Sequence, residues 1–176
     1  LVGIALAEQG LRMPDFRAAE RTFQLLTQVA GRAGRGERPG HVLVQTLAPD
    51  HPAIVSALRH DHTGFVQAEM KNRELGGYPP FSHLALIEGR SLAAADSHNA
   101  LRRIADDLRR RGGVEVRGPL PAGVSKVRNV FRFHVLLRCT DRDILHGALR
   151  YLQADLLPGL PANVRAMVDV DPTEFT

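Results

Sequence analysis

Residues 83–89, with the sequence HLALIEG, open the part of the chain whose hydrophobic pattern decides the fold. This run predicts a strand, and a helix should follow it because Leu101, Ile104 and Leu108 recur on one helical face. Six predicted elements alternate as strand, helix, strand, strand, helix, strand, over residues 83–89, 92–111, 114–117, 131–138, 141–156 and 164–170. That order is typical of a ferredoxin-like βαββαβ domain, which we assign to residues 79–176.

Residues 1–48 indicate a different architecture. The apolar run at residues 1–7 predicts a strand buried on both faces, residues 14–30 an amphipathic helix, and residues 41–46 a second strand. Strand, helix, strand is the order of a parallel sheet with a crossover helix, so this stretch looks like the end of a larger α/β domain.

A helical linker is expected between the two parts, over residues 49–78. Asp50-His51-Pro52 signals a helix start, and Gly76-Gly77-Tyr78-Pro79-Pro80 supplies residues that end a helix. Sparse apolar residues and Gly64 in between leave two alternatives, one bent helix or two short ones.

Composition narrows the class of protein. The chain has 176 residues, and Cys139 is its only cysteine, which excludes an internal disulfide and favours a reducing compartment. No apolar run approaches the roughly 20 residues that a membrane-spanning helix needs. We therefore expect a cytoplasmic protein that does not engage a membrane.

Basic charge is concentrated in the middle of the chain. The formal net charge is +4, and residues 79–139 carry eleven basic residues against five acids, whereas residues 140–176 carry three against six. A surface that faces a polyanion explains this distribution. General replacement of lysine by arginine on solvated faces explains it equally well from composition alone.

The sharpest motif is QVAGRAGR at residues 28–35. Arg32 and Arg35 are three residues apart at a helix end, so they project from nearly the same side with glycines between them. Guanidinium groups placed in this way suit a phosphate chain, and they can stabilise the charge that develops during phosphoryl transfer. A solvated Gly-Arg loop is the alternative for GRAGR alone.

Residues 28–35 resemble motif VI of the superfamily 2 helicases. Further stretches resemble the family of primosomal replication-restart helicases, primosomal protein N′: PDFRAAERTFQLLT at residues 14–27, GYPPFS at 77–82, GPLPA at 118–122 and DVDP at 169–172. The similarity covers essentially the whole chain. It implies a fragment of an ATP-dependent 3′-5′ DNA helicase that recognises stalled or branched replication forks and restarts replication by primosome assembly.

The resemblance also implies roles for particular residues. Residues 1–48 would be the end of the second, RecA-like helicase lobe, in which Arg32 and Arg35 contact the γ-phosphate of ATP and Gln28 couples nucleotide to the lobe interface. ATP and Mg²⁺ would be bound mainly by regions outside this chain, and the zinc-binding cysteines of the family also lie outside it. The chain alone should then be inactive as an ATPase.

One departure from the family pattern leaves an alternative open. Family members usually carry an Asp-x-Asp pair after the first strand, and the aligned residues here are Leu6-Ala7-Glu8. The alternative is a degenerate helicase that acts only as a fork-binding and partner-recruiting scaffold. A third hypothesis, a stand-alone ferredoxin-like nucleic-acid or ribosome-associated module, gives residues 1–48 no role.

The predicted DNA-binding residues are Lys126, Arg128 and Arg132. Gly118-Pro119-Leu120-Pro121 should break the strand before them, so that Lys126 lies on a loop. Arg132 and His134 should point outward from the next strand, and Phe131 and Phe133 should point to the core. Aromatic residues are 5% of the chain and tryptophan is absent, so phosphate contacts rather than base stacking should lead the binding.

Arg142 aligns with an arginine that in relatives captures the carboxylate-ended tail of single-stranded-DNA-binding protein. A surface ion pair with Asp141 or Asp143 is the alternative. Other primosome or helicase-loading proteins complete the expected partners. The spacing of His51, His60 and His62 matches no compact zinc signature, so no metal site is predicted.

Overall fold

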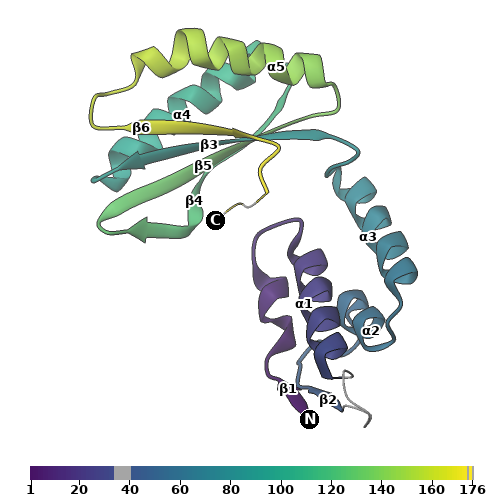
Figure 1. The fold of residues 1–176 in the computed structure, drawn as a ribbon. Coiled ribbons are helices and arrows are strands. Elements are labelled where there is room, and N and C mark those ends of the chain that lie inside the picture. The colour runs from purple at the N-terminus through teal and green to yellow at the C-terminus, as the bar shows by residue number, and fades with distance from the viewer. Residues whose placement is uncertain (34–40, 174, 176) are drawn as a thin grey trace. The chain divides into compact units, whose positions relative to one another are not determined.

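The computed structural model describes residues 1–33, 41–173 and 175 (Figure 1). The chain divides into two compact units, Leu1–Gly76 and Gly77–Thr176. The described residues have an α/β fold with one parallel and one antiparallel sheet. None of the helices in the described part of the chain is long and apolar enough to cross a membrane.

The first unit contains a two-stranded parallel sheet and a cluster of helices. Strand β1 (Val2–Ile4) pairs with β2 (Val42–Val44), and helix α1 (Ala18–Ala33) lies between them in the sequence. A 3₁₀ helix, η1 (Ala7–Arg12), follows β1. Phe23 of α1 stacks on Phe65 with ring centroids 4.1 Å apart, which anchors the core of this unit.

The predicted strand at residues 1–7 is wrong in length and burial. Leu6 has a φ of 52°, a left-handed conformation that ends the strand early, and the 3₁₀ helix begins at Ala7. Leu43 on the paired strand is 68% exposed, because no layer among the described residues covers that face of the two-stranded sheet. Burial on both faces needs covering layers that a two-stranded sheet lacks.

The segment predicted as a linker forms two short helices rather than one bent helix, and both belong to the first compact unit. Helix α2 (Pro52–Leu58) is capped by His51, whose Nδ1 accepts a hydrogen bond from the Ala53 amide at 3.2 Å. Helix α3 (His62–Gly76) follows after His60, which has a φ of 53°. The reversal of φ at His60 separates the two helices.

The second unit has the predicted order of strands and helices. Its strands and α-helices are β3 (His83–Ser91), α4 (Ala94–Arg111), β4 (Glu115–Val127), β5 (Val130–Cys139), α5 (Arg142–Tyr151) and β6 (Arg165–Val170). A π-helical turn, η2 (Leu152–Leu156), and a 3₁₀ turn, η3 (Leu157–Gly159), follow α5. The strands lie in the order β4-β5-β3-β6, and every pairing is antiparallel. Both helices cover the same face of this sheet (Figure 1).

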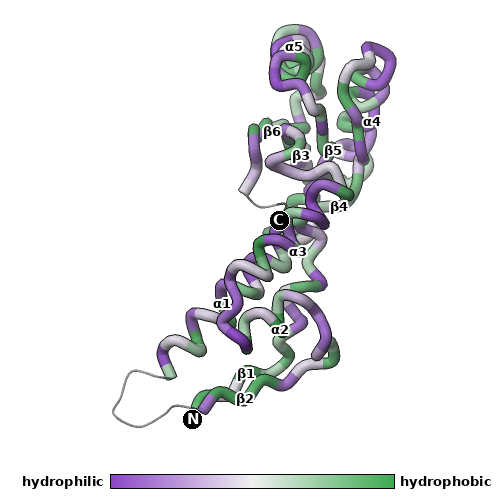
Figure 2. Tube along the Cα trace, turned by 90° about the vertical axis from the view of Figure 1, so that its right-hand side faces the viewer, coloured by the Kyte–Doolittle hydropathy of each residue, from purple (hydrophilic) through white to green (hydrophobic). Residues whose placement is uncertain are grey.

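The core of this unit lies between the sheet and the two helices. Ala85 and Ile87 of β3 and Val135 and Leu137 of β5 are fully buried against Leu101 and its neighbours on α4. Helix α4 changes between hydrophobic and hydrophilic residues along its length (Figure 2), as expected for a helix that covers a sheet with one face. Asp141 caps α5 by accepting hydrogen bonds from the Asp143 and Ile144 amides.

The prediction that residues 118–121 break the second strand is wrong. Strand β4 continues to Val127, with shifts of register between Arg117 and Leu120 and between Pro121 and Lys126. Irregular pairing accommodates the prolines at this edge of the sheet. Gly118 has a φ of 103°, and a Cβ there would lie 2.5 Å from the His134 carbonyl oxygen, so this position requires glycine.

Candidate nucleic-acid interface

The face of the second sheet opposite the helices carries a row of three arginines. Arg90 on the central strand β3 is paired in register with Arg132 on β5 and with Arg165 on β6. Side chains of directly paired residues point to the same face of a sheet, so the three guanidinium groups originate side by side. Like charges in such positions repel one another.

Glu88 lies two residues before Arg90 on β3, so it points to the same face, and it is the centre of a charged network. It is 4% exposed. One of its carboxylate oxygens accepts hydrogen bonds from Arg132 Nε at 2.9 Å and His134 Nε2 at 2.8 Å, and the other accepts one from Arg90 Nε. A single acid therefore holds two of the three arginines in the row.

The electrostatics of Glu88 follow from these contacts. Burial would raise the pKa of its carboxyl group, but hydrogen bonds from Arg132, His134 and Arg90 outweigh that effect and lower the pKa to about 2. Glu88 is accordingly ionised at neutral pH and acts as a fixed anion beneath the arginine row.

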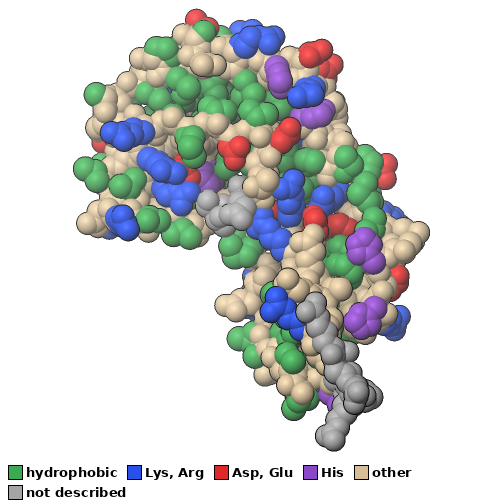
Figure 3. All heavy atoms as spheres, viewed as in Figure 1, with side chains coloured by type: hydrophobic (Ala, Val, Ile, Leu, Met, Phe, Trp, Pro, Cys, Tyr) green, Lys and Arg blue, Asp and Glu red, His purple; other side chains and the backbone are tan. Residues whose placement is uncertain are grey.

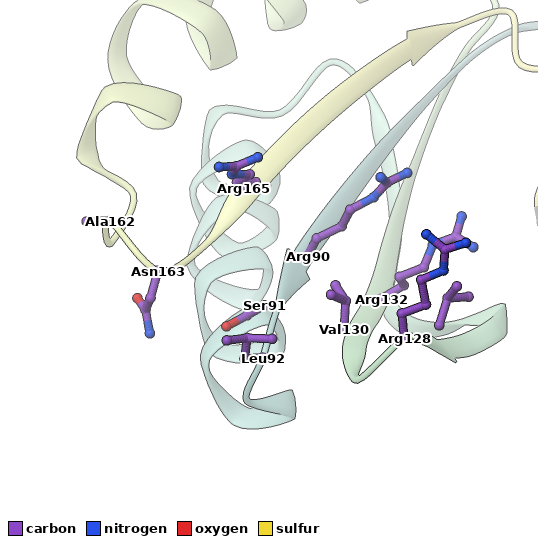
Figure 4. Close-up of a pocket in the computed structure, with 10 residues that line it drawn as sticks. Arg90, Ser91, Leu92, Arg128, Val130, Arg132, Ala162, Asn163 and Arg165 are labelled. Atoms are coloured by element: carbon purple, nitrogen blue, oxygen red, sulfur yellow. The ribbon is translucent and has the colours of Figure 1, made fainter.

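A hollow of about 650 Å³ opens beside the row (Figure 4). Its lining includes four arginines, Arg90, Arg128, Arg132 and Arg165, and none of its ten lining residues is aromatic. Apolar side chains complete it: Leu92, Val127, Val130 and Ala162. On this unit, basic side chains are interspersed with hydrophobic ones (Figure 3). Such a lining is suited to anionic groups rather than to stacked bases.

The structure brings together two of the three predicted DNA-binding residues. Arg128 and Arg132 both line the hollow. Lys126 lies on strand β4 rather than on a loop, and its ammonium nitrogen is 4.9 Å from the centroid of the Phe131 ring. Lys126 is outside the lining of the hollow but remains exposed.

The prediction that Arg132 and His134 present free charge outward needs correction. His134 is 8% exposed, and the Arg132 side chain is 16% exposed because its guanidinium is drawn down to Glu88. Both point away from the helices as predicted, yet an acid on the neighbouring strand engages them. Phe133 packs against the core, as predicted.

Three residues of this site are absent from the sequence-based prediction: Glu88, Arg90 and Arg165. Glu88 and Arg90 are two residues apart in a predicted strand, so their shared face was readable from the alternating period. Their neighbours on β5 and β6 were not, because register between strands distant in sequence leaves no local signal.

The residues predicted to contact ATP lie in the first unit. Gln28 and Arg32 are exposed on α1, Arg32 in its last turn. Arg35 lies outside the described residues. Within the described residues, Arg32 is in no ion pair, so its guanidinium could contact an anionic ligand.

Arg142 is exposed in the first turn of α5. The alternative of an ion pair with Asp141 or Asp143 is not realised among the described side chains, and Asp141 instead accepts hydrogen bonds from backbone amides. Residues 1–33 and 41–173 contain no group of three or more histidine, cysteine or acidic side chains that could hold a metal ion.

Glu8 belongs to the Leu6-Ala7-Glu8 segment that differs from the expected acid pair. It is 5% exposed, and its carboxylate is hydrogen-bonded within the first unit. Its Oε2 accepts hydrogen bonds from the Thr46 hydroxyl at 2.9 Å and the Leu47 amide at 3.2 Å. Hydrogen bonds from its own backbone amide and from Thr46 lower the pKa of Glu8. The carboxylate thereby ties the segment after β1 to the segment after β2.

This α/β chain, with its row of arginines on one sheet face, is similar to a known protein family and to several named proteins. Residues 74–173 match the family Primosomal protein N C-terminal domain. The chain is 38% identical over 152 residues to replication restart protein PriA of Bacillus subtilis (strain 168), covering 85% of this chain and 19% of the relative. It is 37% identical over 179 residues to the protein of that name from Haemophilus influenzae, covering 100% of this chain and 24% of the relative.

The chain belongs to the primosomal protein N family. The family resemblance predicted from the motifs is thereby confirmed. The chain spans about a quarter or less of the length of these relatives, which are 19% and 24% covered.

Proposed function

We propose that this chain is the C-terminal part of an ATP-dependent 3′-5′ DNA helicase that recognises stalled or branched forks and restarts replication by primosome assembly. The observation that carries this proposal is the arginine-lined hollow, which lies within the residues that match the family domain. Relatives named replication restart proteins over most of the chain support the same process.

In this proposal the two units divide the work. The first is the end of a RecA-like lobe, which is supported by the parallel β1–β2 pair and the helix between its strands. The second is a ferredoxin-like DNA-binding domain, which is supported by its element order and by the strand order β4-β5-β3-β6. The protein would act in the cytoplasm, at the nucleoid.

ATP and Mg²⁺ would be held mainly by regions beyond these residues. Arg32 fits a γ-phosphate contact because it is exposed at the end of a helix, and Arg35 and Gln28 would share the task. Hydrolysis of ATP held there would supply the free energy for strand separation. The chain alone would not hydrolyse ATP, and the zinc sites of the family would lie elsewhere.

Forked DNA would contact the second unit through phosphates, with Arg128 and Arg132 in the hollow and Lys126 at the exposed hairpin. Arg142 would bind the terminal carboxylate of the tail of single-stranded-DNA-binding protein, since an exposed guanidinium can hold a carboxylate by two hydrogen bonds. Other primosome or helicase-loading proteins would be recruited alongside it.

Binding of the 176-residue chain to a forked DNA and to a linear duplex of equal length tests this function. We expect tighter binding to the fork, and equal affinities would contradict fork recognition. In a longer chain that includes the ATP-binding regions, we expect Arg32→Ala and Arg35→Ala to abolish DNA-stimulated ATP hydrolysis.

A second candidate is a degenerate helicase that serves only as a fork-binding scaffold. The buried, hydrogen-bonded Glu8 favours it, because the carboxylate that replaces the usual acid pair is engaged by Thr46 and Leu47 within its own unit. The same longer chain separates the two functions, since fork binding without ATP turnover would select the scaffold.

A further inference from the structure

The arginine row combines like charges in directly paired positions with a buried acid beside them. Arg132, Arg90 and Arg165 are direct neighbours across β5, β3 and β6, although like charges in paired positions destabilise a sheet. Glu88 offsets this repulsion for Arg90 and Arg132. Arg165 receives no such partner among the described residues, so one cation of the row is left for an external anion.

Glu88 also fixes the direction of two guanidinium groups. Arg132 donates to it from both Nε and Nη2, and Arg90 donates from Nε. Arg90 keeps further N–H groups for a ligand, because a guanidinium has five and Arg90 donates to Glu88 from Nε. An arginine held in this way loses less conformational freedom when it binds an anion than a free one does.

The spacing suits a chain of phosphates. Neighbouring strands lie about 4.8 Å apart, so the three arginines on β5, β3 and β6 span roughly 10 Å, which is long enough to contact more than one phosphate of a flexible single strand. A hollow of about 650 Å³ is of the size of a small-molecule pocket and cannot enclose a duplex. Leu92, Val127 and Val130 give it apolar walls without an aromatic ring for base stacking.

We propose that Glu88 is a positioning residue that aligns Arg90 and Arg132, and that these two, with Arg128 and Arg165, bind successive phosphates of a single nucleic-acid strand. The site reads the sugar–phosphate backbone and not the bases. This inference rests on the proposed DNA-binding function and adds to it the kind of strand bound, two further binding residues and the group that orients them. An acidic peptide is the competing ligand, but it offers no regular series of phosphates.

The first experiment measures binding of an oligothymidylate strand to the 176-residue chain over a range of salt concentrations. For Arg90→Ala and Arg165→Ala, we expect the slope of log affinity against log salt to fall by about 0.7 for each lost phosphate contact. Arg103→Ala is the matched control, since Arg103 is exposed on α4, which covers the opposite face. An unchanged slope in both row variants would overturn the proposal.

Modified strands identify what the site reads. An abasic strand of the same length should show the same loss of slope in Arg165→Ala, and a strand with a neutral methylphosphonate backbone should not bind the site. If an oligoglutamate peptide bound with dependence on Arg165 while the abasic strand did not, the site would be a peptide site and the proposal overturned. Failure of the unmodified chain to bind any DNA would instead overturn the proposed function itself.

Substitution of Glu88 separates positioning from simple charge. If Glu88 only subtracts positive charge, Glu88→Gln should tighten binding and Glu88→Asp should change nothing. If it positions the arginines, both variants should weaken binding by about tenfold, the equivalent of one lost charged hydrogen bond. Thermal unfolding of each variant confirms that it is folded, and Arg165→Ala tests the site even where a Glu88 variant does not fold.

Discussion

The two faces of the antiparallel sheet are buried by different means. On the covered face, Ile87 and Leu137 are fully buried beneath α4 and α5 by apolar contacts. On the open face of the same strands, Glu88 is 4% exposed because Arg132, His134 and Arg90 converge on it. At Glu88, β3 is therefore buried on the open face by charged side chains, whereas Leu84 and Leu86 farther along the same face are buried apolar residues.

Removal of Leu101 should have the largest effect, because it removes packing from the covered face. Leu101 is fully buried on α4, so Leu101→Ala should reduce the free energy of unfolding by about 2–5 kcal/mol in urea titrations. Leu92→Ala is the control, since Leu92 is 75% exposed and its loss should change stability by less than about 0.5 kcal/mol. Equal losses would mean that the helices do not provide the main core.

Neutralisation of Glu88 tests the open face and should have a smaller effect. Glu88→Gln keeps the size of the side chain but weakens the hydrogen bonds from Arg132 and His134, so we expect a loss of about 1–3 kcal/mol. A double-mutant cycle with Arg132→Ala should give a coupling free energy of about 0.5–3 kcal/mol. Additive losses would show that the network contributes nothing to this face.

The dependence of stability on pH should distinguish the two faces further. The folded-state pKa of Glu88 is about 2, below its ordinary value of 4.5, so its contribution is complete above about pH 4.5 and is lost as the pH falls through about 2. Because the Arg90 side chain of this network is partly exposed and solvent screens its charge, we expect the loss in the free energy of unfolding to be about 1 kcal/mol. Chemical unfolding at several pH values should show it in the unmodified chain, and its persistence in Glu88→Gln would assign it to other acids.

The smallest effects should come from neighbouring residues on β6. Met167 pairs with Glu88 on the open face and is 53% exposed, whereas Val168 pairs with Ile87 and packs against the core. Val168→Ala should therefore cost about 1 kcal/mol, and Met167→Ala less than about 0.5 kcal/mol. A reversed order in thermal unfolding would mean that the alternation along β6 is assigned to the wrong faces.

The elements of the second unit were predictable because their information is local. The hydrophobic periods of α4 and β3 are visible within short stretches of sequence, and the predicted order of strands and helices agrees with the observed order. The length of β4 was not predictable, since Pro119 and Pro121 ordinarily end a strand, and here the irregular pairing with β5 tolerates them. The parallel pairing in the first unit was predicted, but the burial of its first strand was not, because burial depends on which layers surround a strand.

The candidate site was predicted in part for a similar reason. Arg128 and Arg132 were found from the basic cluster on one hairpin, which is a local feature. The contact between Arg132 and Glu88 joins residues 44 positions apart, and it makes a cation that points out of the sheet the half-buried partner of an acid. Only the register of β3 against β5 carries that information, and a single sequence does not display it.

The turn between β4 and β5 has a consequence for how this protein could evolve or be engineered. Arg128 and Asn129 have φ values of 48° and 65°, and while asparagine tolerates this left-handed conformation, an arginine is disfavoured there relative to glycine. A screen that rewards only heat resistance should therefore replace Arg128 by glycine early. The resulting protein would be more stable to heat but would lack one of the four arginines of the hollow. Stability and ligand affinity therefore compete at this position.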